Sequence, residues 1–265
     1  SAGLLDRAED LFQELVEADS HKVQALRQLI DIFEQEKDWP RAISCTEQLE
    51  AVTQAPMGAR VAQYWCEIAE QDVGRDALDS ALEHAERAAK IDPKCARSSI
   101  LQSDILQRLD RHAEAIAALR RVESQEPDYL SEAIPRLRVS ADALGHHKEL
   151  SDYLGHIIQD HGSVTATLAM AEWIENVSGV DEAAAFMTER LDDKPSVRGL
   201  GRLIELERLR NQTGPHLQAL GQMTEQLLSN RPFYQCTHCG FPAKLHHWQC
   251  PSCKHWDSIR PIHGV

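Results

Sequence analysis

The clearest pattern in the chain is a recurring small residue that marks one helix of a repeated helix pair. This marker position returns every 34 residues, with a single five-residue insertion, at Ala8, Ala42, Ala81, Ala115, Glu149, Ala183 and Leu217. A proline follows twelve residues after three of the markers, at Pro93, Pro127 and Pro195. A small side chain lets two helices approach closely, and proline ends a helix before the next pair begins. The spacing therefore predicts a series of helix–turn–helix repeats.

The segments that precede the markers carry apolar stripes with helical spacing. Leu26, Leu29, Ile30 and Phe33 form one stripe, and helix-favouring residues dominate the composition. The pattern resembles the tetratricopeptide repeat, and it predicts a mainly α fold with an α-solenoid over residues 1–230. Because Ala8 marks a second helix, we expect the chain to begin halfway through a repeat and to be truncated at its N-terminus. The uncovered end of such a solenoid would permit a homo-dimer.

Two cysteine pairs follow the predicted repeats. Cys236 and Cys239 form the first C-x2-C pair, and Cys250 and Cys253 form the second, ten residues further on. Four thiolates with this spacing suit one tetrahedral Zn²⁺ or Fe ion with metal–sulfur distances of about 2.3 Å. The segment is too short for a hydrophobic core of its own, so a metal would stabilise it. We therefore predict a four-cysteine metal-binding module over residues 231–265.

Charge and composition narrow the range of functions. The formal net charge of −14 argues against non-specific binding of nucleic acid or an anionic membrane by the whole chain. No apolar run approaches the roughly 20 residues that a membrane-spanning helix needs. The remaining cysteines, Cys45, Cys66 and Cys95, are expected to be buried in a reducing compartment. No motif of a nucleophilic hydrolase, phosphate loop or zinc protease occurs, so we expect neither an enzyme nor a small-molecule substrate.

The junction between the two predicted regions is short and rich in aromatic residues. Only residues 229–232 separate them, and the module carries Phe233, Tyr234, Phe241, Trp248 and Trp256. A flexible tether would be longer and richer in glycine or serine. We therefore predict that the module packs on the last repeats, residues 199–230. Lys254 occupies a position where glycine often follows a cysteine pair, so we also expect backbone strain there.

The first helices of the pairs also predict a surface for partner proteins. At fixed offsets from the markers they carry a series of carboxylates, with arginines at neighbouring offsets, and this arrangement predicts a mixed but mainly acidic concave groove. Such a groove would prefer a basic or amphipathic segment of a partner. The predicted groove residues are Asp31, Glu34, Glu70, Asp104, Glu172 and Glu175.

The C-terminal motif, placed behind such repeats, resembles the lipopolysaccharide assembly protein B (LapB, or YciM) family of Gram-negative bacteria. The resemblance covers essentially the whole chain and is carried most specifically by Tyr234, Cys236, Cys239, Gly240, Phe241, Trp248, Cys250, Pro251, Ser252, Cys253, Trp256, Ile259, Pro261, Ile262 and Gly264. It implies an adaptor that promotes degradation of the deacetylase LpxC by the membrane protease FtsH. Further implied partners are components of lipopolysaccharide assembly and transport. The resemblance also implies that the four cysteines bind the metal in a rubredoxin-like, zinc-ribbon-like module over residues 231–265. It further implies that an N-terminal anchor, absent here, holds the protein at the cytoplasmic face of the inner membrane.

Two other functions remain open on the sequence alone. A rubredoxin-like iron would support electron transfer, which reversible one-electron changes in the visible spectrum would reveal. A ribbon-like module would support nucleic-acid binding, since four basic residues stand against one acidic residue from Arg231 onward. The acidic repeats oppose nucleic-acid binding, so we expect an adaptor without nucleic acid as a partner.

Overall fold

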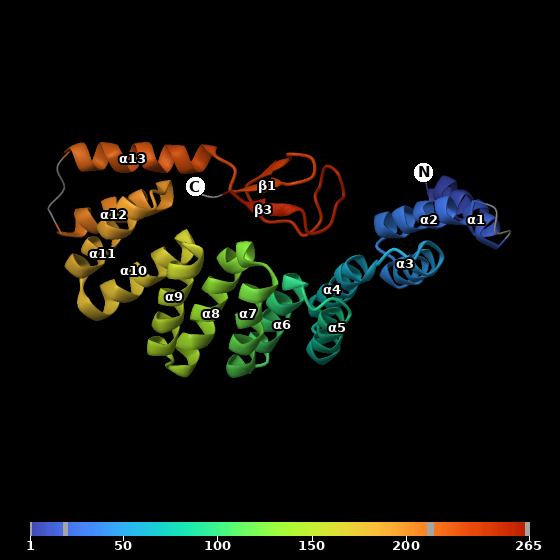
Figure 1. Ribbon diagram of the computed structural model, residues 1–265, viewed down its shortest axis with the longest axis horizontal. Helices are drawn as coiled ribbons and strands as arrows, with labels where there is room; N and C mark the ends of the chain where they lie inside the picture. Colours follow the sequence, from blue (N-terminus) through green and yellow to red (C-terminus); the bar gives the residue numbers. More distant parts are fainter. Residues whose placement is uncertain (1, 18–20, 211–214, 263–265) are drawn as a thin grey trace. The chain divides into compact units, whose positions relative to one another are not determined.

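The computed structural model of the protein describes residues 2–17, 21–210 and 215–262 (Figure 1). The chain divides into two compact units, residues 1–111 and residues 112–265. Helices make up nearly all of the first unit, and the second unit combines helices with a small sheet (Figure 1). The prediction of a mainly α fold is therefore confirmed.

The first unit consists of antiparallel helices arranged in consecutive pairs. α2 packs on α3 and α4 packs on α5, while α1 lies against α2. Ala42 and Ala81, two of the predicted marker residues, are fully buried where the helices of their pairs meet. Asp38 caps α3 by accepting a hydrogen bond from the backbone N–H of Arg41. The helices are α1 (Ala2–Glu17), α2 (Lys22–Glu36), α3 (Trp39–Thr53), α4 (Gly58–Gly74), α5 (Leu78–Ile91) and α6 (Ala96–Arg108).

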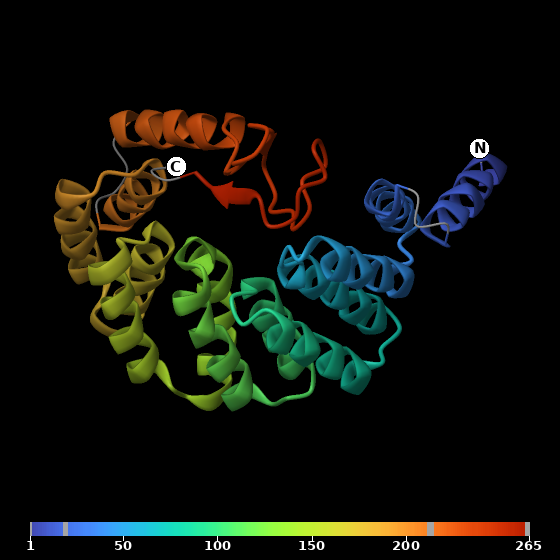
Figure 2. The same ribbon diagram turned by 45° about the vertical axis from the view of Figure 1, so that its right-hand side comes forward.

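The second unit continues the same pattern of paired helices, which Figure 2 shows from a second direction. α10 packs on α11, and α12 packs on α13. Ala183 on α11 is fully buried in a cluster with Ala171 of α10 and Leu206 of α12. The helices are α7 (His112–Gln125), the short 3₁₀ helix η1 (Pro127–Tyr129), α8 (Leu130–Leu144), α9 (His147–His161), α10 (Val164–Ser178), α11 (Val180–Asp193), α12 (Val197–Arg210) and α13 (Pro215–Asn230).

A three-stranded antiparallel sheet follows the last helix. β1 (Tyr234–Cys236) lies between β2 (Pro242–Ala243) and β3 (Ile259–Pro261), with Gln235 paired to Pro242 on one side and to Arg260 on the other. The short strands enclose Cys236, Cys250 and Ile259 as a small buried centre. The helices end at Asn230 and β1 begins at Tyr234, so the predicted boundary between residues 230 and 231 falls in the connection and stays a proposal.

The described helices were compared with the length and hydropathy that a membrane-spanning helix needs. No helix in the described part of the chain is both long enough and apolar enough to cross a membrane.

Candidate metal centre and its docking surface

The two C-x2-C segments fold into turns with the same hydrogen-bond pattern. The backbone N–H of Cys236 donates to the carbonyl of Phe241, and that of Cys250 donates to the carbonyl of His255, both at 2.9 Å. The residue after each pair donates back to the first cysteine, from Gly240 and from Lys254. Both of these residues have a left-handed backbone, with φ of 77° at Gly240 and 60° at Lys254. The expected strain at Lys254 is thus confirmed, because a lysine adopts a conformation that suits glycine.

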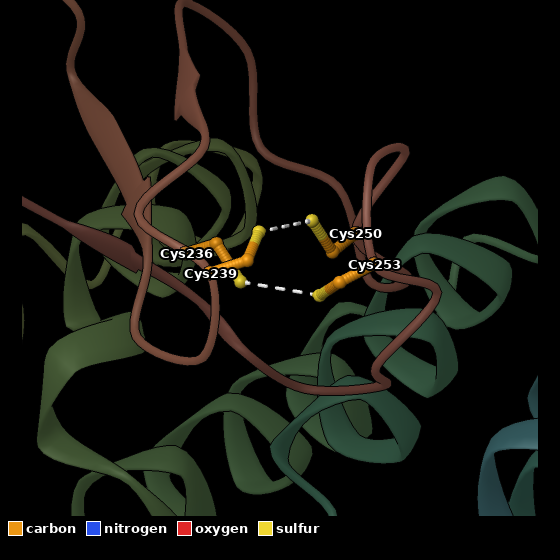
Figure 3. A group of neighbouring side chains, drawn as sticks. All are labelled: Cys236, Cys239, Cys250 and Cys253. Carbon is orange, nitrogen blue, oxygen red and sulfur yellow. Dashed lines mark hydrogen bonds between the residues drawn. The ribbon is translucent and has the colours of Figure 1, made fainter.

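These turns bring the four cysteine sulfurs together (Figure 3). All four Sγ atoms lie within 4.8 Å of one another. The Sγ atoms of Cys236 and Cys253 are 3.7 Å apart, and so are those of Cys239 and Cys250. A tetrahedron with metal–sulfur bonds of about 2.3 Å has edges of about 3.8 Å, so the sulfur cage fits one such ion. The four cysteines therefore form a metal-binding site of the kind that holds zinc or iron.

The surroundings of Cys236 favour the thiolate form that a metal requires. Burial opposes ionisation of Cys236, but the Ser258 hydroxyl and the backbone N–H groups of His238 and Cys239 outweigh it and lower the pKa of this thiol to about 6. Cys236 and Cys250 are buried, whereas Cys239 is exposed and Cys253 is half-buried. One side of the sulfur cage therefore faces solvent.

The module is docked on η1 and the start of α8 through a set of polar links. The Tyr129 hydroxyl donates to Asp257, and the Tyr234 hydroxyl donates to Glu132. Arg260 pairs with Glu126 at 3.2 Å, and its guanidinium lies 4.6 Å from the centre of the Tyr129 ring. The predicted docking on the helices is confirmed. Its predicted place is mostly wrong, since the main contacts fall on η1 and α8 rather than on residues 199–230.

In the described part of the chain, the module has fewer polar links to the last helices than to η1 and α8. Lys244 donates to the carbonyl of Ser229 near the end of α13. The docking surface lies elsewhere because the short connection only fixes where the module begins. The aromatic and charged side chains of the module determine which surface it covers, and the residues that they contact lie on η1 and α8.

A half-buried histidine completes this docking surface. The His246 ring packs edge-on against Tyr129, Tyr234 and Trp248, with ring centres 4.3 to 5.5 Å apart. Its Nε2 atom is buried without a hydrogen-bond partner among the described residues. Burial lowers the pKa of His246 to about 4, although the carboxylates of Glu132 and Asp257 act in the opposite direction. His246 is therefore neutral at pH 7 and serves as a packing group.

The predicted groove carboxylates lie on the first helices of the pairs, and most of them face arginines. Glu34 of α2 bonds Arg60 of α4 at 2.9 Å, and Asp31 lies 3.7 Å from the same guanidinium. Glu70 of α4 bonds the buried Arg97 of α6 at 2.8 Å. The surface in the first unit is thus a ladder of ion pairs between successive first helices. Asp104 lies half-buried on α6 of the same unit.

The second unit repeats this arrangement around a cleft. Glu172 of α10 pairs with Arg138 of α8, and Glu175 of α10 pairs with Arg202 of α12. These four side chains line a cleft of about 670 Å³ formed by α8, α10, α12 and α13. The sequence analysis predicted the carboxylates of this surface but did not predict that arginines pair with them. A regular separation of 26 or 27 residues between Glu34 and Arg60, and between Glu175 and Arg202, would have revealed the pairing.

Sequence reasoning also missed residues at both faces of the module. Tyr129 and Glu132 gave no local signal, because their partners lie 128 and 102 residues away. His238 and His255 stand within and beside the cysteine pairs, and their rings stack with centres 3.4 Å apart. Their position beside metal-type cysteines is a signal that could have been used.

Family profiles match both parts of this architecture. A family profile described as rubredoxin metal binding domain matches residues 234–261, and a tetratricopeptide repeat profile matches residues 71–129. Among solved structures, the crystal structure of MamA protein covers 64% of this chain and 90% of its own, with a TM-score of 0.41 and 16% identity.

The curated relatives match along nearly the whole chain. Lipopolysaccharide assembly protein B of Haemophilus influenzae is 27% identical over 98% of this chain and 66% of its own length. The protein of the same name from Escherichia coli K12 is 31% identical over the full chain and 69% of its own length. With helical repeats, the cysteine module and this level of identity in place, the chain belongs to the lipopolysaccharide assembly protein B family.

Proposed function

We propose that the protein is a non-catalytic adaptor that limits lipopolysaccharide synthesis by promoting FtsH-dependent degradation of the deacetylase LpxC. The observation that carries this proposal is the 31% identity to lipopolysaccharide assembly protein B across the full chain. The matched region includes both the helical repeats and the cysteine module. Helical repeats of this type offer extended surfaces to partner proteins, which suits an adaptor.

The proposed metal ligands are Cys236, Cys239, Cys250 and Cys253, holding one Zn²⁺ or Fe ion. When bound, the ion would cross-link the two cysteine turns and hold β1 and β3 in register. All four positions are taken by protein sulfur, which is typical of structural rather than catalytic sites. The residues of the module that contact η1 and α8 would then be presented as one rigid surface.

The proposed partner surface is the ladder of ion pairs on the first helices. In the second unit, the cleft beside Glu172 and Glu175 has the size of a site for a peptide segment. Because arginines pair with these carboxylates, a partner segment would meet alternating charges, and a basic or amphipathic segment would compete for the carboxylates. We further propose that the full-length protein acts at the cytoplasmic face of the bacterial inner membrane.

A replacement experiment tests the adaptor function. Residues of this chain would replace the matching region of the Escherichia coli protein in a strain whose own copy can be depleted. LpxC lifetime would then be followed by immunoblot after protein synthesis is blocked. If the proposal holds, the replacement restores rapid LpxC loss, and the same protein carrying Cys250→Ser does not.

The control separates adaptor function from protein abundance. Ser252→Ala changes an exposed residue between two of the cysteines and should leave LpxC loss unaffected. A stable LpxC in cells that contain normal amounts of the unmodified replacement would refute the proposed function.

A further inference from the structure

A second group of metal-type side chains lies beside the sulfur cage. One ring nitrogen of His238, one ring nitrogen of His255 and the Sγ atom of Cys253 lie within 4.8 Å of one another. Both histidines are exposed, and Cys253 is half-buried. None of these histidines is needed for the four-sulfur site, which is complete without them. The group therefore sits on the solvent side of the cage.

The histidine pair is held in place by the fold of the two turns. His238 lies inside the first cysteine pair, and His255 lies two residues beyond the second, so the matched turns carry both rings to one side. The rings stack face to face, with an angle of 18° between their planes, so one of these exposed rings must turn before both lone pairs point at one ion. Nδ1 of His255 lies 3.2 Å from the carbonyl oxygen of Cys253. When Nδ1 donates to that carbonyl, Nε2 carries the lone pair, which is the usual arrangement of metal-binding histidines.

The charge of a filled sulfur cage would attract a second cation. Four thiolates around one divalent ion carry a net charge of about −2, and each sulfur keeps lone pairs that face outward. Cys253 is only half-buried, and its sulfur belongs to both groups of ligand atoms. Imidazole and thiolate together suit zinc and other late divalent transition metals.

We propose that His238, His255 and the Cys253 thiolate form a second, solvent-facing site for a divalent transition metal such as Zn²⁺. Cys253 bridges the two ions in this arrangement, and the histidines bind only the outer one. With three protein ligands, the outer ion keeps an open position for water, unlike the closed four-sulfur site. The outer site binds more weakly and exchanges more readily than the inner one.

The test uses the full chain carrying one equivalent of Zn²⁺ after dialysis to remove loosely bound metal. Calorimetric titration with further Zn²⁺ should show one additional equivalent. His238→Ala and His255→Ala should each weaken this second event by about tenfold or more, since each removes one of three ligands. The first equivalent, measured by metal analysis, should remain in both variants because the four sulfurs are unchanged.

His247→Ala is the matched control, since it removes an exposed imidazole from the same module without touching the proposed site. It should leave both equivalents intact. A second readout uses Co²⁺ as the added ion, because a sulfur-to-cobalt charge-transfer band would report the Cys253 bridge. The band should vanish in the double variant His238→Ala/His255→Ala.

Several results would overturn the inference. These are uptake of only one equivalent, a second equivalent that persists in the double variant, or equal loss in His247→Ala. A chain that binds no tight first equivalent would refute the four-sulfur site and the bridged site together. LpxC degradation plays no part in these measurements, so failure here leaves the adaptor proposal to its own test.

Discussion

At the scale of single residues, Arg97 is a buried positive charge that needs the carboxylates of its neighbours. Its side chain is only 1% exposed, yet it bonds Glu67 at 2.7 Å and Glu70 at 2.8 Å. The carboxylates themselves reach solvent, with 23% and 46% of their side chains exposed. Losing the two carboxylates would therefore leave the buried cation uncompensated, whereas water can solvate the carboxylates if the cation is lost.

This asymmetry gives a prediction for stability. Glu67→Gln combined with Glu70→Gln leaves the guanidinium buried without a counter-charge and should cost about 3 kcal/mol. Arg97→Met leaves carboxylates that water can solvate, so it should cost less, about 1–2 kcal/mol. Urea unfolding would compare the free energies, with the exposed Glu86→Gln as the neutral control. A larger loss in Arg97→Met than in the double variant would contradict the argument.

His246 gives a prediction for the pH dependence of the module. Its pKa is lowered to about 4 in the folded protein by burial, while an unfolded histidine titrates near 6.5. The unfolded state therefore takes up the proton first, and stability is lost as the pH falls from about 6.5 towards 4. Between pH 7 and pH 5, this proton uptake lowers the free energy of unfolding by about 2 kcal/mol.

The pH effect is measured against a variant that cannot titrate at this position. Urea unfolding of the wild-type module, followed by tryptophan fluorescence at pH 7, 6 and 5, should weaken more steeply than that of His246→Phe. Protonation of the cysteines affects both proteins alike, so the difference in slope reports His246. Parallel pH profiles would show that its burial does not govern the acid response.

At the scale of elements, the sequence predicted what depends on local spacing. Ala42, Ala81 and Ala183 recur at fixed intervals and are fully buried between paired helices, because close helix contact leaves no room for larger side chains. The cysteine turns follow from their C-x2-C spacing in the same way. Glu149 continues the interval but is exposed on α9, where the repeat pattern is weak.

What could not be predicted depends on contacts between distant segments. η1 carries Tyr129, whose partner Asp257 is 128 residues away, and no periodic signal links two such positions. The stacked pair of His238 and His255 likewise depends on how two separate turns face each other. Residue spacing alone carries no information on either arrangement.

The docking contacts predict how damage to the metal site spreads through the second unit. Cys250→Ser removes one sulfur ligand, and the turn that leads to Asp257 and Ile259 should loosen. Hydrogen exchange in residues 127–134 should then speed up, since Tyr129 bonds both of these residues.

Ser252→Ala, an exposed substitution in the same turn, provides the control for this exchange experiment. Unchanged protection of residues 127–134 in a Cys250→Ser protein that has lost its metal would show that the docking contacts survive without it.

At the scale of the whole molecule, the net charge of −14 coexists with ion pairs along the first helices. Glu172 pairs with Arg138, so the charge at position 172 can be reversed either alone or together with that of its partner. Comparing the two variants separates the effect of the charge from the effect of losing the ion pair. If LpxC docks in this cleft, as the proposed function implies, Glu172→Lys should weaken its binding by about threefold to tenfold at low salt, and the difference should shrink as salt rises. Binding would be measured by calorimetry with purified proteins.

The exchanged pair Arg138→Glu/Glu172→Lys keeps the ion pair and the net charge of this part of the cleft. Its affinity should return most of the way to that of the wild type if the net charge of the cleft matters. Equal affinity of the wild type and Glu172→Lys at every salt concentration would leave this cleft without a role in binding.

The return of the chain from α13 to η1 changes how the second unit can come apart. A row of repeats normally frays from its last member, because each repeat contacts only its neighbours. Here the segment after the last helix closes a circuit through Tyr129 and Glu132, bridging 128 and 102 residues. The helices in between already hold the two ends near each other, so closing the circuit adds little entropic cost. The final helices should therefore unfold together with the module, as links of one closed loop rather than as the free end of a row.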